Sequence, residues 1–251
     1  MPLFIAYDAW VSALCLGLLM LGGWWAGARF GGGNAADTEL SRFDDGALAL
    51  FGLLLAFCFS GAAARYDTRK QLVLAEATAI GDFAGTAALM AEPQRTQLLR
   101  EVHAYTEQRL SFGKLRLDDP AQPTLERQLR ALQNRIGALV AACVQQGNTP
   151  SAHEPLIDTF NAMSTALENR AQGLRDHMPE SIVCMLFAFA IFSTFTMGRA
   201  ADGKRLGSAI AYTALIALVF WVTMDLEHPR RGLLRVSQRP MLELAAHLPQ
   251  P

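Results

Sequence analysis

The side chains that most often perform catalysis are scattered through this sequence rather than grouped. Its five histidines are His103, His153, His177, His228 and His247. None of them lies at metal-ligand spacing with a cysteine or another histidine. The chain has no phosphate-binding loop, no G-x-S-x-G turn and no C-x-x-C pair. Lone carboxylates such as Glu76 and Asp82 could act as a catalytic acid or base. On a helix face, however, such side chains are more often solvated at the protein surface. We therefore expect no enzyme, no cofactor and no metal.

Charges crowd together in two short segments instead. The first is Arg65-Tyr66-Asp67-Thr68-Arg69-Lys70, and the second is Asp225-Leu226-Glu227-His228-Pro229-Arg230-Arg231. On a helix, Arg65 and Arg69 share one face because they are four residues apart, while Asp67 lies on another face. Two interpretations are open. Either these residues anchor a membrane border, as Arg and Tyr commonly do, or the segments meet and Arg65 or Arg69 pairs with Asp225 or Glu227.

Both segments adjoin stretches that contain no charged residue. Four such stretches, of 20, 19, 18 and 19 residues, are Ala9 to Ala28, Gly46 to Ala64, Ser181 to Gly198 and Leu206 to Met224. About 20 apolar residues in a helix cross the hydrocarbon layer of a bilayer. The first stretch lacks the basic leader of a secretion signal, so we interpret it as a retained span. The chain is therefore predicted to be a polytopic membrane protein in contact with membrane lipid.

The distribution of charged residues along the chain indicates where the predicted domains lie. Residues 65–180 hold 13 Lys and Arg against 14 Asp and Glu, a balance that argues against nucleic acid as a partner. Nine Lys or Arg flank the membrane on the side of this segment and five on the other side, which favours a cytoplasmic segment and cytoplasmic termini. We expect spans one and two in residues 1–64, a cytoplasmic domain in 65–180, spans three and four in 181–224, and a cytoplasmic tail in 225–251.

The central segment is predicted to be helical, and no strand-like alternation occurs anywhere in the chain, so the fold class is all-α. Its clearest stripe has spacings of 4, 3, 4, 3 and 4, at Leu125, Leu129, Leu132, Ile136, Leu139 and Cys143. A further helix begins near Ser151 and carries Leu156, Phe160, Met163, Leu167 and Leu174. The two stripes are expected to form bundle core, within one chain or between subunits.

Within the spans, only cysteine and tyrosine are ionisable. Ion-coupled pumps and transporters usually place a carboxylate or base near the bilayer centre, whereas a channel gates with a hydrophobic constriction and needs none. In the second span Leu50, Leu54, Phe57 and Gly61 share a helix face and are candidates to line a pore. The alternative is that they face lipid or pack against a helix. Four helices enclose little space, so a pore requires several subunits.

The two charged segments also carry a family resemblance. Phe59-Ser60-Gly61-Ala62-Ala63-Ala64-Arg65-Tyr66-Asp67-Thr68-Arg69, continued by Glu76-Ala77-Thr78-Ala79-Ile80-Gly81, resembles the signature of bacterial bestrophin-like membrane proteins. The second match is Asp225-Leu226-Glu227-His228-Pro229-Arg230-Arg231-Gly232, followed by Val236-Ser237-Gln238. The order of two spans, a helical segment, two spans and a tail is similar over nearly the whole chain.

The resemblance implies a pentameric ion channel in the bacterial inner membrane, with a neck of aromatic and aliphatic residues on span two. By that resemblance Leu54 and Phe57 are neck candidates, and Arg65, Asp67 and Glu76 are candidates for the vestibule. Animal bestrophins also bind calcium after span four, where this chain has only Asp225 and Glu227 beside Arg230 and Arg231. We therefore expect a homo-oligomer that conducts an inorganic ion. The alternative is a noncatalytic scaffold or sensor that acts through its helical domain.

Overall fold

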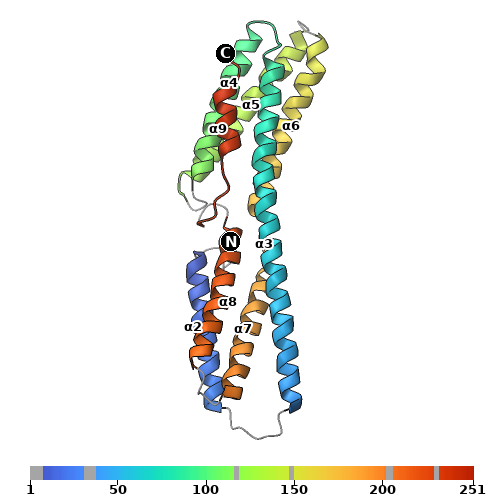
Figure 1. Cartoon of the computed structure of the whole chain (residues 1–251). Coiled ribbons are helices and arrows are strands. Elements are labelled where there is room, and N and C mark those ends of the chain that lie inside the picture. The colour runs from blue at the N-terminus through green and yellow to red at the C-terminus, as the bar shows by residue number, and fades with distance from the viewer. Residues whose placement is uncertain (1–7, 31–37, 116–118, 147–149, 202–205, 229–231) are drawn as a thin grey trace. The chain divides into compact units, whose positions relative to one another are not determined.

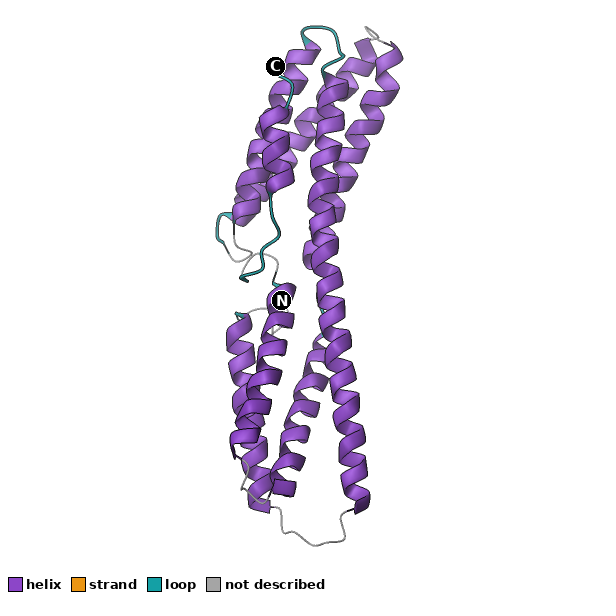
Figure 2. Cartoon of the chain, viewed as in Figure 1, coloured by secondary structure: helices purple, strands orange, loops and turns teal. Residues whose placement is uncertain are grey.

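A computed structural model describes residues 8–30, 38–115, 119–146, 150–201, 206–228 and 232–251 (Figure 1). Throughout these ranges the regular secondary structure is α-helix, as the sequence predicts (Figure 2). The helices are α2 (Ala9–Phe30), α3 (Thr38–Ala87), α4 (Gln94–Lys114), α5 (Gln122–Gln146), α6 (Pro150–Arg175), α7 (Glu180–Ala201), α8 (Leu206–Glu227) and α9 (Arg239–His247).

The chain divides into two compact units. The first, here called the membrane unit, comprises Met1–Tyr66 and His177–Leu234. The second, here called the helical unit, comprises Asp67–Asp176 and Arg235–Pro251. Helix α3 contributes its first part to the membrane unit and its second part to the helical unit.

Four helical stretches are long and apolar enough to cross a membrane, in agreement with the sequence. They are Ala9–Phe30, a window within Asp45–Ala87 of α3, a window within His153–Ala200, and Leu206–Glu227. The range His153–Ala200 overlaps most of α7. The sequence explains why these segments are helices in lipid, because every backbone N–H and C=O in a helix is satisfied within the segment. Buried hydroxyl groups in α7 follow the same rule, since Ser193 and Thr194 both donate to the backbone oxygen of Ala190.

Glycines allow α2 and α7 to pack at very short range within the membrane unit. A Cβ atom added at Gly27 would collide with the backbone oxygen of Phe195, and one added at Gly198 would collide with the backbone oxygen of Trp24. Gly23 faces Ile191 in the same contact, where the backbone oxygen of Ile191 would lie 3.0 Å from an added Cβ. Small residues spaced four apart bring membrane helices together in this way. Gly23 and Gly27 therefore fix the position of α2 against α7.

The helical unit has its own apolar core, built from the stripes that the sequence predicts. Leu129, Leu132, Ile136 and Cys143 of α5 are buried in it, and so are Leu156 and Met163 of α6. Helix α5 packs against both α4 and α6. Gly137 of α5 lies directly against the ring of Phe160, which in turn meets Phe83 of α3 with 5.9 Å between ring centroids. The stripes thus face other helices of the same chain.

The carboxyl-terminal segment completes this core. Met241 of α9 is fully buried, and Leu244 packs against α3 beside Gly81. His103 of α4 lies 2.9 Å from the backbone oxygen of Pro249 through its Nε2 atom. Residues 235–251 therefore belong to the body of the helical unit.

The glycine contact generates a first prediction. Gly27→Ala is expected to lower the stability of the membrane unit by about 1–3 kcal/mol, because the new methyl group meets backbone that cannot yield. Gly22→Ala is the matched control, since an added Cβ there has nothing within 4 Å. Thermal unfolding in detergent measures both variants. Equal melting temperatures for the two would contradict the proposed close contact.

Candidate functional site

Helix α3 separates its side chains by face. In the membrane unit Phe51, Leu55, Cys58 and Ala62 are buried and recur at spacings of 4, 3 and 4. Residues on the opposite side are exposed, and they form a stripe along the helix. We call this set the exposed line of α3; it consists of Leu53, Phe57, Ser60, Ala64, Asp67, Gln71, Ala75, Thr78 and Asp82. From its first to its last member the set advances 29 residues in eight turns. The average spacing is therefore the 3.6-residue period of an α-helix.

The four predicted pore residues occupy different parts of this pattern. Leu50 and Phe57 are 53% and 66% exposed, so neither is committed to packing within the chain. Leu54 and Gly61 are half-buried at the margin of the exposed side. Leu53, which spacing alone did not single out, is 52% exposed and lies on the line with Phe57. The exposed apolar surface is therefore centred on Leu53 and Phe57.

The two charged segments meet within the membrane unit, so the pairing interpretation is confirmed for Arg65 and Glu227. Arg65 Nε and Nη2 lie 2.7 and 2.6 Å from Glu227 Oε1. The other carboxylate oxygen of Glu227 accepts a hydrogen bond of 3.1 Å from the backbone N–H of Met178. Glu227 is 1% exposed, and breaking a buried pair leaves an uncompensated charge. This contact joins α3 to the end of α8 and to the residues that precede α7.

Asp225 has a different role from the predicted one of pairing with arginine. Its two carboxylate oxygens accept hydrogen bonds from the backbone N–H groups of Leu233 and Leu234, at 3.0 and 2.9 Å. Gly232 packs so closely on this carboxylate that an added Cβ would lie 2.5 Å from Oδ1. Asp225 therefore holds the backbone of Leu233 and Leu234 against the end of α8.

These two acids do not fit a calcium ion. Calcium takes six to eight oxygen ligands, whereas the oxygens of Asp225 and Glu227 are directed at N–H donors. Arg230 and Arg231, which accompany them in the sequence, lie outside the described residues.

Arg69 supports the end of α6 in the helical unit. Its Nε and Nη2 atoms donate to the backbone oxygens of Gly173 and Asp176, at 3.2 and 2.7 Å. The last carbonyls of a helix have no partner within the helix and carry partial negative charge, so an arginine is well suited to them. Arg69 is 3% exposed. It therefore acts as a structural cap and does not face solvent.

Glu76 belongs to a buried cluster, so the expectation of a solvated carboxylate is wrong. Glu76 is fully buried, and its Oε1 lies 2.6 Å from Arg109 Nε while its Oε2 accepts a 2.7 Å hydrogen bond from Arg109 Nη2. Arg170 Nη1 also contacts Oε2. Burial opposes the charge of Arg109, but Glu76 outweighs it and raises the pKa of Arg109 above its ordinary value. Glu76 therefore ties α3 to α4 and α6.

This cluster extends to the carboxyl-terminal segment through residues that sequence reasoning did not join. Arg170 Nη2 donates a 2.7 Å hydrogen bond to Gln238 Oε1. Burial, together with the nearby charge of Glu76, raises the pKa of Tyr105, so its phenol remains protonated. The only sequence signal was that Glu76 and Gln238 both fall within the quoted family motifs.

Asp67 and Lys70 remain at the surface of α3. Their side chains are 67% and 55% exposed, and the Lys70 Nζ to Asp67 Oδ1 distance is 3.8 Å. A pair with this exposure contributes little to stability. Asp67 thus lies on a different face of α3 from Arg65 and Arg69, as the sequence predicts.

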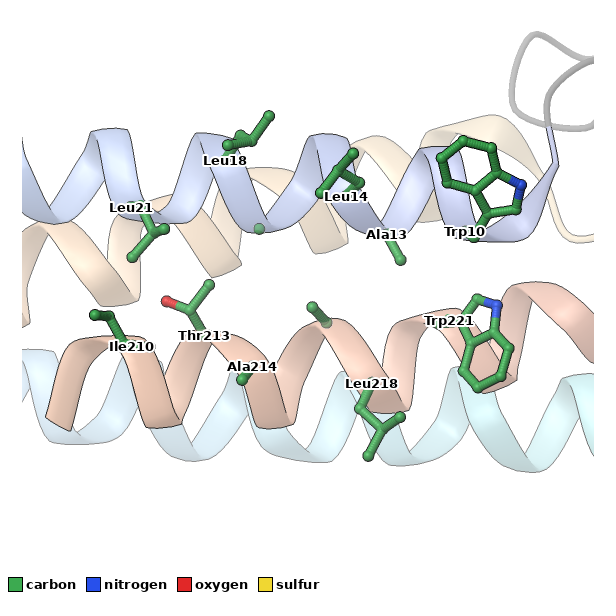
Figure 3. A pocket seen from close by; sticks show the side chains of 12 residues that line it. Trp10, Ala13, Leu14, Leu18, Leu21, Ile210, Thr213, Ala214, Leu218 and Trp221 are labelled. Atoms are coloured by element: carbon green, nitrogen blue, oxygen red, sulfur yellow. The ribbon is translucent and has the colours of Figure 1, made fainter. Parts of the chain in front are cut away.

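A groove of about 510 Å³ lies between α2 and α8 of the membrane unit (Figure 3). Trp10 and Trp221 flank one end of it, and Leu21 and Ile210 lie at the other. No charged residue is among those that line it. Because α2 and α8 are both candidate spans, this groove is suited to apolar neighbours.

Comparison with known proteins identifies the family. The Bestrophin-like domain model matches residues 45–241, which is most of the chain. The chain belongs to the bestrophin-like family. Its sequence finds no match among curated proteins.

Solved structures share the bestrophin-like fold at low sequence identity. A bacterial bestrophin homologue from Klebsiella pneumoniae is 14% identical, with a TM-score of 0.64 over 95% of this chain and 99% of that one. A variant of that homologue gives 12% identity and a TM-score of 0.62, covering 95% and 98%. A variant described as a membrane protein gives 14% identity and a TM-score of 0.66, covering 95% and 99%. At these identities the likeness concerns the fold.

The pair between Arg65 and Glu227 generates a second prediction. Arg65→Met is expected to lower the free energy of unfolding by about 3–5 kcal/mol, because it leaves the buried carboxylate of Glu227 without its partner. Lys70→Met removes a cation from the same helix, but its partner is exposed, so the expected change is within about 0.5 kcal/mol. Chemical unfolding in detergent compares them. If Lys70→Met lowered the free energy of unfolding as much as Arg65→Met, the buried pair would not be the cause of the lost stability.

Proposed function

We propose that this chain is one subunit of an oligomeric ion channel with a hydrophobic neck lined by α3, the second membrane span. The observation that carries the proposal is the exposed apolar part of α3. Leu53 and Phe57 are more than half exposed, although they lie within a segment apolar enough to cross a membrane. Since the opposite face of α3 is buried by the same chain, the exposed face is the one available to a pore.

The absence of charge from the spans in the sequence supports a channel over a coupled transporter. A transporter that binds a coupling ion needs an ionisable group within the membrane. A ring of leucine and phenylalanine side chains suits a gate that closes by drying and opens by wetting. We therefore assign the neck to Leu50, Leu53 and Phe57, with Leu54 and Gly61 at its margin.

Several copies of the chain are required to surround a pore. We propose a homo-oligomer in which each subunit contributes α3, and a pentamer follows from the family relationship to bestrophins. Membrane lipid covers the outer faces of the spans, and an inorganic ion passes along the axis.

We further propose how the chain is arranged across the membrane. Residues 1–64 and 181–224 hold the four spans, and residues 65–180 form a helical domain in the cytoplasm. The tail, residues 225–251, and the amino terminus lie on the same side. The excess of Lys and Arg on that side of the spans, nine against five, supports this orientation in a bacterial inner membrane.

A noncatalytic scaffold or sensor is the second candidate. It is favoured by the helical unit, which has a core of its own that includes the carboxyl-terminal segment. The two functions differ along the axis of the oligomer, because a channel needs a continuous water path there. Reconstitution of the purified oligomer into a planar bilayer separates them. Currents that require the protein support the channel, and a silent oligomer of correct size supports the scaffold.

The proposed neck generates a third prediction. Phe57→Ala is expected to increase open-channel conductance or basal leak, because it removes the bulkiest side chain from the exposed line. Phe59→Ala makes the same chemical change on the same helix at a residue that is 40% exposed but lies off that line, so conductance should remain unchanged. Single-channel recording measures both variants. If Phe57→Ala leaves conductance and gating unaltered, Phe57 does not form the neck.

A further inference from the structure

We propose that the groove between α2 and α8 binds a lipid-soluble molecule of the quinone class, and that Thr213 donates a hydrogen bond to a carbonyl oxygen of its ring. The groove lies wholly within the membrane unit, and both of its helices are apolar enough to cross a membrane. Its volume of about 510 Å³ is within the range of about 300–1,000 Å³ that is typical of pockets for small molecules.

Thr213 distinguishes this groove from an ordinary apolar surface. It is 5% exposed, and Figure 3 shows its side chain pointing from α8 toward α2, into the groove. Among the described residues, none forms a hydrogen bond with its Oγ1 atom. Burial of a hydroxyl group without a hydrogen bond is unfavourable. We therefore expect a ligand in the groove to supply the partner.

Other buried hydroxyl groups of the membrane unit are satisfied by their own helices. Ser193 and Thr194 bond to a backbone oxygen of α7, and Thr223 donates to a backbone oxygen of α8 at 2.8 Å. This arrangement is common for serine and threonine in membrane helices. Thr213 departs from it, although it lies on the same helix as Thr223.

The other lining residues suit an apolar ligand. Leu14 and Leu18 of α2 and Leu218 of α8 line the groove and are each more than half exposed. Gly17 of α2 lies close to Thr213, since a Cβ atom added at Gly17 would be 3.8 Å from the methyl carbon of Thr213. A residue without a side chain at this position leaves space beside the threonine.

The depth of Thr213 in the membrane limits the chemical class of the ligand. Thr213 lies seven residues after the first residue of α8 and 14 residues before the last. It is therefore about 10 Å from one end of the helix and about 20 Å from the other. The ester and phosphate groups of phospholipids and the hydroxyl groups of lipid alcohols stay at the membrane border, where water hydrates them. A quinone differs because its carbonyl oxygens only accept hydrogen bonds and enter hydrocarbon together with the ring.

Two tryptophans lie at one end of the groove. Trp10 is the second residue of α2, Trp221 lies six residues before the end of α8, and Figure 3 shows both indoles at the same end. Along α8, Thr213 is eight residues from Trp221, a distance of about 12 Å. In the proposed complex the quinone ring lies at Thr213, and its apolar tail follows the groove toward the two indoles.

Tryptophan fluorescence tests the inference, with the purified protein in lipid nanodiscs and decylubiquinone as the probe. Wild-type fluorescence should fall to a plateau as the probe is added, because Trp10 and Trp221 flank a saturable site. Thr213→Val keeps the shape of the side chain and removes the hydroxyl, so the dissociation constant should rise about tenfold. Thr213→Ser keeps a hydroxyl and should restore the affinity. Thr223→Val is the matched control, since Thr223 is a buried threonine of α8 outside the groove, and the affinity should not change.

Three results would overturn the inference. Quenching that never reaches a plateau in the wild type would indicate collisions in the membrane in place of a site. An unchanged dissociation constant in Thr213→Val would exclude the hydrogen bond. Decylbenzene, which has a similar tail but no carbonyl group, should compete about tenfold less well, and equal competition would exclude recognition of a quinone. The assay requires no ion current, so a failure to bind is distinct from a failure of the proposed channel.

Discussion

The rotation of α3 about its own axis is the constraint on which the structure depends, and buried charges set it. Arg65, Arg69 and Glu76 lie on one side of the helix because they are four and seven residues apart. Each has a partner on another element: Glu227 on α8, the last carbonyls of α6, and Arg109 on α4. Charges that leave water without a partner cost several kcal/mol each. Turning α3 would break all of these contacts, so one face of the helix is held inward.

What faces outward then follows from the helical period. The side turned away from the three charges carries the exposed line, which is uncharged from Leu53 to Ala64 and mostly polar, with its two acids, from Asp67 to Asp82. In a membrane protein, exposed leucine and phenylalanine side chains can contact lipid, another subunit or a gated pore. The proposed function assigns this face to a pore. In the proposed channel, several copies of α3 present Leu53 and Phe57 to a water-filled axis.

Sequence reasoning recovered the parts of this account that depend on local pattern. The length of the apolar stretches predicted the membrane spans, and the spacing from Leu129 to Cys143 predicted the packing face of α5. It also limited the partners of Arg65 to two acids, of which Glu227 is the observed one. The buried cluster at Glu76 was missed because Arg109 and Arg170 are 33 and 94 residues away and no local period links them. Leu53 was missed because one sequence does not show which side of an apolar helix the rest of the chain covers.

Cysteine accessibility along α3 tests the central claim most directly. In an assembled channel lacking the native cysteines, single cysteines at Leu53, Phe57 and Ser60 should react with a charged, water-soluble thiol reagent and alter the current. Cysteines at Phe51, Leu55 and Ala62, which are buried by the chain, should not react. Modification at the second set in place of the first would contradict the rotation assigned to α3, and with it the pore.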